Sequence, residues 1–241
     1  MKRRRDRHTL ATVPSLPFLS RLSAAAIVLA GCSGDVPIDV NVGPLSFDVD
    51  VSRIAVPAAL QASGSIARVP CAAASTCPST PGLALRCAAG SCDPDPVTID
   101  LSSVVDLSTY SSELGTLGDN LSSIGVSAMS WQATAAGLRI PVGPIDVYWG
   151  PEAASGVGSD GVRKLGTIPV IRFDGVNTAH GDIALDAAGN AALSNHLLNV
   201  SRRFRFFARA SVDLVPGGAL PAGRASMQVR MRVHAESTLL R

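Results

Sequence analysis

The sequence predicts an all-β fold, an antiparallel β-sandwich with one or two short helices and a disulfide-tied loop. Three observations lead to this prediction. Apolar and polar residues alternate in many short runs, which is the pattern of strands with one buried face. Turn-forming Gly, Pro, Asn and Asp separate these runs. Four cysteines fall within one stretch that is rich in Ala, Ser, Pro and Gly.

The first two strands are expected at 36–42 and 45–51, where apolar residues occupy every second position. Gly43-Pro44 separates the two runs and predicts either a tight turn or a bend. A two-residue turn would place Asp39 opposite Asp48, an unfavourable pair of like charges. The acidic residues that share the polar face of these strands are Asp39, Asp48 and Asp50.

The middle of the chain combines further strands with two short helices. Strands are expected at 97–101, 124–134, 138–149 and 165–173. Leucines at spacings of three and four predict a helix over 107–121. A second helix is predicted over 187–199, and a hairpin around Gly189-Asn190 is the alternative for that stretch.

The last two strands are predicted to form a hairpin across the loop VPGGALPAGR, with 204–214 pairing with 227–235. One face of this hairpin is apolar, and the other carries five arginines. These possible anion-contacting residues are Arg203, Arg205, Arg209, Arg230 and Arg232. The acidic first strands, lipid phosphate or an acidic partner would supply the anions. Together the strands form one sandwich domain over 36–241, of immunoglobulin-like or related type.

The first 32 residues have the parts of an export signal. A basic start, MKRRRDRH, precedes an apolar stretch of roughly ten residues, about half of the ~20 that a membrane-spanning helix needs. The stretch ends in Leu29-Ala30-Gly31-Cys32, which resembles the lipobox of bacterial lipoproteins. An ordinary secretory signal with a chance cysteine is the alternative.

The lipobox resemblance implies that residues 1–31 are a signal peptide and that Cys32 becomes the lipidated first residue. Residues 32–35 are then a lipidated tether. Two or three acyl chains, such as palmitate, hold a protein stably on a membrane because each buried CH₂ contributes about 0.8 kcal/mol. In this family an Asp after the cysteine signals inner-membrane retention, so Ser33 favours the outer membrane.

The remaining four cysteines predict two disulfides, because an even number in an exported chain indicates oxidation. These residues, in the loop 71–95, are Cys71, Cys77, Cys87 and Cys92. Four cysteines allow three pairings, and the sequence favours none of them. A zinc site is the competing interpretation, but the stretch has no CxxC and no histidine nearby.

The charge distribution and the motifs predict no nucleic-acid partner, no metal and no cofactor. The chain has 21 Lys and Arg against 19 Asp and Glu, with acids gathered in 32–119 and arginines in 202–241. Such a bipolar distribution is not that of a nucleic-acid-binding protein. GVGSDG at 156–161 matches GxGxxG, but a strand-like run follows it instead of a helix, which predicts a surface loop.

A calcium site formed by Asp174, Asn177 and Asp182, near His180, is the other metal hypothesis, although turns use the same residue types. No GxSxG is present to indicate a hydrolase nucleophile. We therefore expect a non-catalytic, lipid-anchored protein of the cell envelope with a structural or binding role. Its partners would be the membrane, through the lipid anchor, and another envelope protein. A carrier of an apolar ligand is the alternative, and an envelope enzyme is the third hypothesis.

Overall fold

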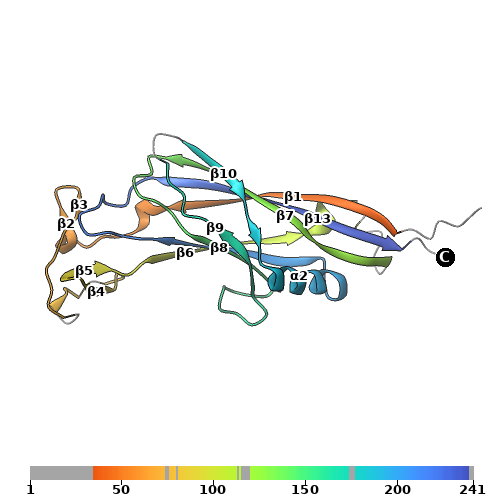
Figure 1. The fold of residues 1–241 in the computed structure, drawn as a ribbon, viewed down its shortest axis with the longest axis horizontal. Helices are drawn as coiled ribbons and strands as arrows, with labels where there is room; N and C mark the ends of the chain where they lie inside the picture. Colours follow the sequence, from red (N-terminus) through yellow and green to blue (C-terminus); the bar gives the residue numbers. More distant parts are fainter. Residues whose placement is uncertain are drawn as a thin grey trace, which may run out of the picture. The chain divides into compact units, whose positions relative to one another are not determined.

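The strands form two antiparallel sheets packed face to face, which confirms the predicted fold class (Figure 1). The computed structural model describes residues 35–73, 76–79, 81–112, 114, 120–173 and 177–238. All of these residues belong to the unit Ser33–Arg241.

The first sheet, here called the β13 sheet, has four strands. Their order is β1 (Asp35–Asp50), β13 (Arg224–Thr238), β7 (Leu121–Ala136) and β10 (Thr178–Asp182). The second, the β12 sheet, has the order β11 (Ala184–Leu185), β9 (Arg163–Ile168), β8 (Ile145–Gly150), β12 (Arg203–Val212) and β6 (Val97–Asp106). The chain passes directly from β10 to β11, which links the two sheets along one edge. The opposite edge is formed by β1 and β6.

The core consists of the apolar side chains that the two sheets direct at each other. Phe47 of β1 stacks on Phe206 of β12, with 5.6 Å between the ring centroids. Every second residue along β12 and β13 is buried, as the alternation predicts. Burial of each large apolar side chain contributes about 1.5–3 kcal/mol, so these alternating positions stabilise the sandwich.

The predicted hairpin between the last two strands is wrong. β12 pairs with β6 and β8, whereas β13 pairs with β1 and β7. The loop between them therefore crosses from one sheet to the other instead of turning within one. The apolar faces still meet, but across the core, and the five arginines are divided between the two outer surfaces of the sandwich.

The two runs at the start of the domain form the single strand β1. Its pairing with β13 shifts register between Val42 and Leu45, so Gly43-Pro44 is a bend and not a turn. Gly43 has φ of +108°, and a Cβ there would lie 2.8 Å from the carbonyl oxygen of Val229, so this close approach requires glycine. Asp39 and Asp48 consequently lie on one strand and do not face each other.

Four predicted strands in the middle of the chain are present with changed limits. β6 and β7 are longer than expected, and β8 starts only at Ile145. Residues 138–144 instead form a loop that contacts the next connection through a bridge between Val142 and Ile171. β9 ends at Ile168 because Pro169 has no N–H for a further ladder bond.

The predicted helix over 187–199 is confirmed as α2 (Ala187–Asn199), and the hairpin alternative is excluded. Asp186 caps it by accepting a hydrogen bond from the Gly189 N–H. Gly189 lies so close to β9 that a Cβ would clash with the carbonyl oxygen of Lys164. The indole N–H of Trp149 donates to the Gly189 carbonyl, 2.9 Å away, which fixes the helix on β8.

Part of the predicted helix over 107–121, namely residues 113 and 115–119, lies outside the described residues. Its described part begins with the 3-10 turn η4 (Leu107–Thr109), and β7 already starts at Leu121. Two further 3-10 turns, η1 (Val51–Arg53) and η2 (Ala58–Leu60), follow β1.

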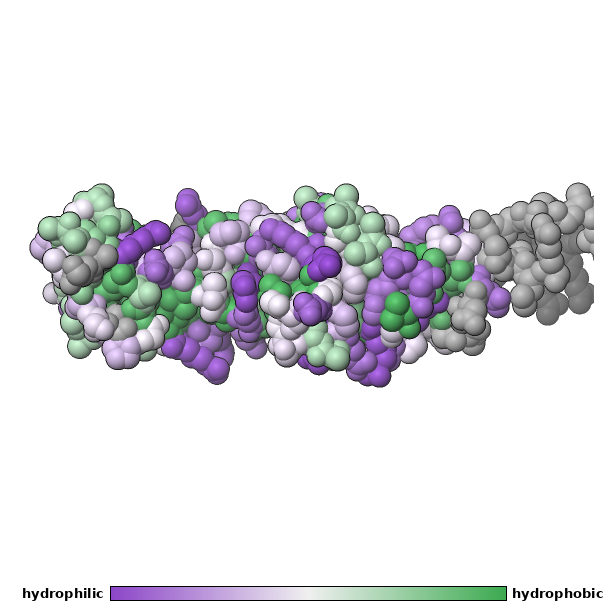
Figure 2. All heavy atoms as spheres, turned by 90° about the horizontal axis from the view of Figure 1, so that it is seen from below, coloured by the Kyte–Doolittle hydropathy of each residue, from purple (hydrophilic) through white to green (hydrophobic). Residues whose placement is uncertain are grey.

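Two small hairpins lie at the end of the sandwich where β1 finishes (Figure 1). One pairs β2 (Gln61–Ala62) with β3 (Ser65–Ile66), and the other pairs β4 (Leu85–Ala88) with β5 (Ser91–Pro94). Asp35 pairs with Thr238, so the first and last described residues lie together at the opposite end. Viewed from the side of α2, the surface shows more hydrophobic colour toward the hairpin end than in the middle (Figure 2).

Candidate functional site

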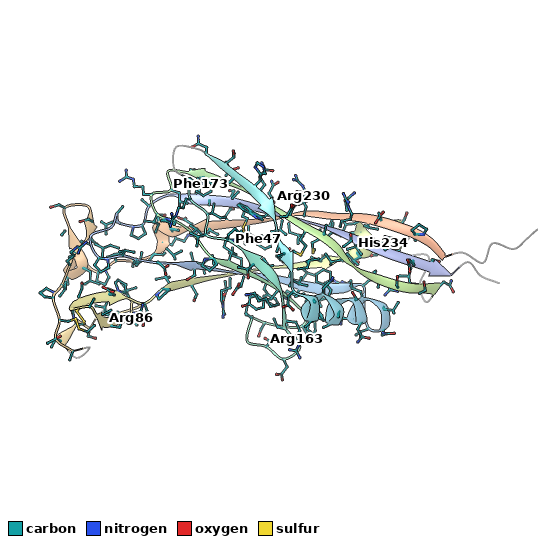
Figure 3. All side chains as sticks on the ribbon, viewed as in Figure 1. Phe47, Arg86, Arg163, Phe173, Arg230 and His234 are labelled. Atoms are coloured by element: carbon teal, nitrogen blue, oxygen red, sulfur yellow. A yellow bond between two sulfur atoms is a disulfide. The ribbon has the colours of Figure 1, made fainter. Side chains whose placement is uncertain are left out.

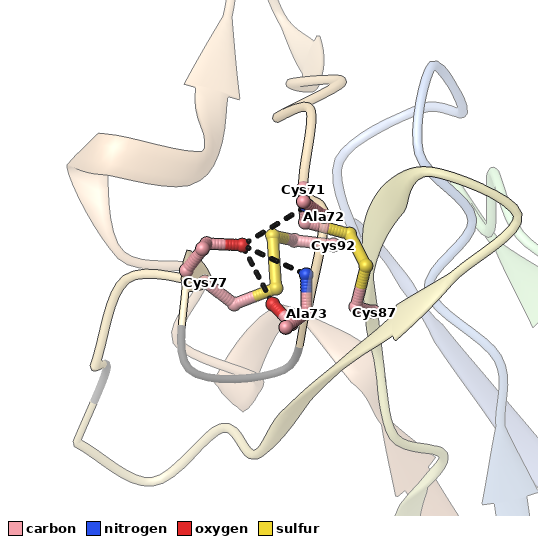
Figure 4. Close-up of a disulfide and its surroundings, with 7 residues drawn as sticks. Cys71, Ala72, Ala73, Cys77, Cys87 and Cys92 are labelled. Atoms are coloured by element: carbon pink, nitrogen blue, oxygen red, sulfur yellow. Dashed lines mark hydrogen bonds between the residues drawn. A yellow bond between two sulfur atoms is a disulfide. The ribbon is translucent and has the colours of Figure 1, made fainter.

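Two disulfides hold the loop that the sequence predicts to be crosslinked (Figure 4). Cys71 bonds Cys87, and Cys77 bonds Cys92. Cys87 and Cys92 are direct neighbours across the β4–β5 hairpin, so each strand of this hairpin is attached to the preceding loop. The two bridges span 16 and 15 residues and overlap in sequence. Closing one loop of this length removes about 3 kcal/mol of unfolded-state entropy.

Within the described ranges, one group of three side chains has the spacing of metal ligands, and it consists of Cys71, Cys77 and Cys92. These sulfur atoms are close together because of the disulfides, whereas zinc requires thiolates. The proposed calcium ligand Asp174 lies outside the described residues. His180 and Asp182 belong to strand β10 and not to a turn.

The histidines contribute to separate structural contacts. His196 of α2 packs against Trp149, and its Nε2 lies 3.0 Å from the carbonyl oxygen of Arg203. His234 of β13 lies 3.0 Å from Asp39 of β1. GVGSDG is part of the loop between β8 and β9, as predicted, and the strand β9 follows it.

The outer surface of the β12 sheet contains a row of alternating charges from neighbouring strands. Arg209 of β12 makes two hydrogen bonds to Asp100 of β6, at 2.6 and 2.7 Å. On its other side Arg209 is in register with Asp146 of β8, which accepts hydrogen bonds from Lys164 at 2.7 Å and Thr167 at 2.8 Å. The sign of the charge thus reverses from each strand to the next, which stabilises the row.

The other two arginines of β12 are also paired. Arg203 contacts Glu152 at 2.8 Å and Asp106 at 3.5 Å, and Arg205 donates to the carbonyl oxygen of Glu152. The charges also perturb the acids that they contact. The hydrogen bond from Arg209 holds the pKa of Asp100 below its usual range. Burial acts to raise the pKa of Asp146, but the hydrogen bonds from Lys164 and Thr167 outweigh it and lower that pKa.

The acids of β1 use partners other than the five arginines. Asp39 pairs with His234, Asp48 accepts a 2.6 Å hydrogen bond from the Ser226 hydroxyl, and Asp50 pairs with Arg53 at 3.3 Å. The hydrogen bond that His234 donates to the Asp39 carboxylate raises the pKa of His234. The arginines of the predicted hairpin therefore do not neutralise the acids of β1 through ion pairs.

Arg230 and Arg232 lie on the outer surface of the β13 sheet without an ionic partner in the described part of the chain. Among the described residues, their side chains make one hydrogen bond, from Arg230 to Gln228 at 3.5 Å. They border a shallow hollow of about 390 Å³, here called the Arg230–Arg232 hollow. Its other residues are Asn41, Val42, Gly43, Ala128, Met129, Ser130, Asp182 and Met231.

A larger groove, of about 640 Å³, lies where the edge strands β1 and β6 face each other. Its apolar surface comes from the inward side chains of β6 and the segment after β1, namely Val97, Ile99, Leu101 and Ile54, all of them half-buried. Charged residues surround this surface: Asp48, Asp50, Asp100, Arg53 and Arg224. The groove is here called the β1–β6 groove.

Neither concave site was predicted from the sequence. The strand at 97–101 was expected, but its position at a sheet edge, which leaves its inner face half-exposed, depends on long-range pairing. The hollow has one local signal, the small residues Ala128 and Ser130 on the polar side of β7. Their proximity to Arg230 and Arg232 depends on the register between β7 and β13.

In the described parts of the chain, no helix combines the length and the apolar character that a bilayer-spanning segment requires. No protein-family model matches the chain, and no curated protein matches it.

Solved structures match the chain at low similarity. A chain of Desmodium yellow mottle tymovirus is 10% identical, and the match covers 100% of this chain and 98% of that chain with a TM-score of 0.27. An empty-head form of Turnip yellow mosaic virus matches at 10% identity over 98% of this chain and 92% of that chain, with a TM-score of 0.24. Turnip yellow mosaic virus itself matches at 10% identity, 69% and 88% coverage, and a TM-score of 0.24. Such TM-scores lie below the range in which a shared fold is argued.

Proposed function

We propose that the protein is a lipid-anchored lipoprotein of the cell envelope, with a non-catalytic binding or structural role. The observation that carries the proposal is the place of Cys32 among the five cysteines. The other four bond to one another within the domain, which leaves Cys32 without a disulfide partner at the end of the lipobox-like LAGC. Two disulfides also suit a chain that folds in an oxidising compartment.

The start of the domain suits a short tether. Only Ser33 and Gly34 separate Cys32 from β1, a reach of about 10 Å at ~3.3 Å per residue. β1 has 16 residues and therefore extends over about 50 Å, so its far end lies well away from the anchor. The crosslinked β4–β5 hairpin lies at that far end (Figure 1), where it is available to another envelope protein.

The anchor is tested by replacing the thiol that lipidation requires. Cys32→Ser should abolish labelling with radioactive palmitate and leave an unprocessed precursor in the producing cell. The paired change Cys71→Ser/Cys87→Ser is the matched control, because it removes one disulfide and should leave lipid labelling intact. Normal processing and labelling of Cys32→Ser would refute the proposal.

Membrane sorting gives a second, separate test. With Ser33 after the lipidated cysteine, the protein should fractionate with the outer membrane of a two-membrane cell. Ser33→Asp should move it to the inner membrane. A wild-type protein found only in the inner membrane would overturn the sorting proposal and leave the anchor itself standing.

The β1–β6 groove favours a second function, carriage of an apolar ligand. Its volume lies within the ~300–1,000 Å³ of small-molecule sites, and its surface is built from half-buried Val97, Ile99 and Leu101. A fluorescent fatty acid should bind the purified protein, and Ile99→Asp should weaken that binding. Val104→Asp is the matched control, since Val104 lies on the same strand but is exposed on its outward face. Equal loss in both variants would exclude the groove as the binding site.

A further inference from the structure

The unpaired arginines of the β13 sheet point to an anion that comes from outside the chain. Arg230 and Arg232 are two residues apart on one strand, so both side chains project from the same outer surface, about 7 Å apart at their origins. Like charges so close repel each other unless an anion lies between them. Their planar, forked guanidinium groups match the geometry of phosphate oxygens.

The hollow beside these arginines leaves room for such a group. Arg232 is in register with Ala128 of β7, and Arg230 with Ser130. Because these side chains are small, the surface of β7 beside the arginines stays open. On the β1 side, Arg232 is opposite Asn41. The amide of Asn41 and the hydroxyl of Ser130 are additional donors at the rim.

The far rim restricts the type of anion. Asp182 of β10 is in register with Ser130, so it lies two strand spacings, about 9.6 Å, from Arg230 along the same row. Its exposed carboxylate makes no hydrogen bond or ion pair within the described residues. This group repels a bare anion, but it accepts hydrogen bonds from a hydroxyl or an ammonium group.

We propose that the Arg230–Arg232 hollow binds a phosphate ester whose alcohol part carries an ammonium or hydroxyl group. Arg230 and Arg232 hold the phosphate, and Asp182 accepts from the donor group on the other side. This inference goes beyond the lipoprotein proposal and does not depend on lipidation of Cys32.

A general membrane-surface role suits this outer surface less well than a discrete ligand does. Acidic residues lie along the same surface on both sides of the hollow, and an anionic bilayer would repel them. They are Asp39, Asp48, Asp50 and Glu236. A phosphate ester can be a free small molecule or a lipid headgroup, and the two sources share the chemistry that the hollow recognises.

O-phosphoethanolamine is the probe, with inorganic phosphate as the comparison, and binding to the purified full chain is measured by calorimetry. O-phosphoethanolamine should bind saturably and more tightly than phosphate. Removing each forked contact costs about tenfold in affinity, so Arg230→Gln/Arg232→Gln should abolish measurable binding. Arg163→Gln is the matched control, because it removes one exposed arginine on the opposite side of the sandwich (Figure 3) and should leave binding unchanged.

Asp182→Asn tests the far rim independently. It should weaken O-phosphoethanolamine binding several-fold and leave inorganic phosphate binding equal or tighter. Absence of saturable binding by the wild type, or equal loss in Arg163→Gln and the double variant, would overturn the proposal. Unchanged discrimination between the two probes in Asp182→Asn would overturn the assigned role of Asp182.

Vesicles then distinguish the source of the ligand. If phosphatidylethanolamine vesicles bind the protein and Arg230→Gln/Arg232→Gln abolishes this binding, the headgroup of a lipid is the ligand. If only the soluble ester binds in an arginine-dependent way, the ligand is a free phosphate ester. Both outcomes support the site, and they assign it to different sources.

Discussion

The two outer surfaces of the sandwich use the same residue type in opposite ways. On the β12 sheet, Arg203 and Arg209 contact carboxylates, and Arg205 donates to a backbone carbonyl. On the β13 sheet, Arg230 and Arg232 have no carboxylate partner among the described residues. Both sets come from strands with the same alternation of arginine and apolar residues. The two sets differ because the neighbouring strands place carboxylates beside the arginines of β12 but not beside Arg230 and Arg232.

The three arginines of β12 are therefore paired within the fold, whereas Arg230 and Arg232 of β13 lack a carboxylate partner among the described residues. Arg209 of β12 is flanked by Asp100 and Asp146. On β13, Arg230 is in register with Ser130, and Arg232 is flanked by Ala128 and Asn41. An arginine that is paired with a carboxylate of the fold stabilises the protein but has little charge left to bind a ligand. Two neighbouring arginines without such a partner repel each other and are available to bind an anion. This comparison can be tested by stability measurements on matched variants.

The largest effect is expected for Asp146→Asn on the β12 sheet. Lys164 and Thr167 would lose a charged acceptor, which costs about 1–2 kcal/mol after allowance for solvent screening of a side chain that is 32% exposed. Urea denaturation at pH 7 measures the free energy of unfolding. The matched change Asp182→Asn on the β13 sheet should leave that free energy unchanged. Equal losses in both variants would remove the distinction between the surfaces.

The Asp146→Asn loss should also depend on pH in a defined direction. Because the pKa of Asp146 is lowered by folding, its stabilising contribution is complete above the ordinary Asp pKa of about 4. The contribution decreases as the pH falls through the lower, folded-state pKa. The difference between wild type and Asp146→Asn should therefore shrink in acid, and a difference that grows there would contradict the assigned cause.

A smaller effect is expected in double-mutant cycles. Asp100→Asn and Arg209→Gln should couple by about 0.5–1 kcal/mol, because the pair is bidentate but half-exposed. On the β13 sheet, Asp39→Asn and Arg232→Gln should couple by less than about 0.3 kcal/mol, because Asp39 contacts His234 instead. A coupling energy for Asp39 and Arg232 as large as that for Asp100 and Arg209 would show that Arg232 is compensated in solution.

A still smaller gain is expected when the missing carboxylate is added. Ala128→Asp places an acid in register with Arg232 and should raise the free energy of unfolding by a few tenths of a kcal/mol, about the value of a cross-strand ion pair. Ser102→Asp is the control on the β12 sheet, where Asp100 is already on the same face of β6. It should be neutral or slightly destabilising. Destabilisation by Ala128→Asp would argue against an uncompensated positive charge at Arg232.

The smallest effect concerns the exposed pair of Asp39 and His234. The hydrogen bond to Asp39 raises the pKa of His234, so its contribution to stability is present below the ordinary His pKa of about 6.5. That contribution is lost as the pH rises through the raised pKa. In an NMR titration, Asp39→Asn should move the pKa of His234 back toward its ordinary value, while Asp48→Asn should not.

The sequence by itself determined which faces of the strands are buried. Alternation along β12 and β13 identified the apolar positions that form the core, and the spacing of Leu193 and Leu197 indicated α2. The cysteine count indicated two bridges. These features follow from local geometry, because successive side chains of a strand point to opposite sides and those of a helix recur every three to four residues.

Only the tertiary structure decided which strands pair. The alternation of β12 is the same whether its hydrogen bonds go to β13 or to β6 and β8, so the hairpin prediction had no local pattern to correct it. Four features depend on this pairing of distant strands. They are the disulfide pairing, the bend at Gly43-Pro44, the β1–β6 groove and the division of the arginines between the two sheets. Arg209 and Arg232 occupy similar sequence patterns, and their different neighbours exist only because strands far apart in the chain lie side by side in the folded sheets.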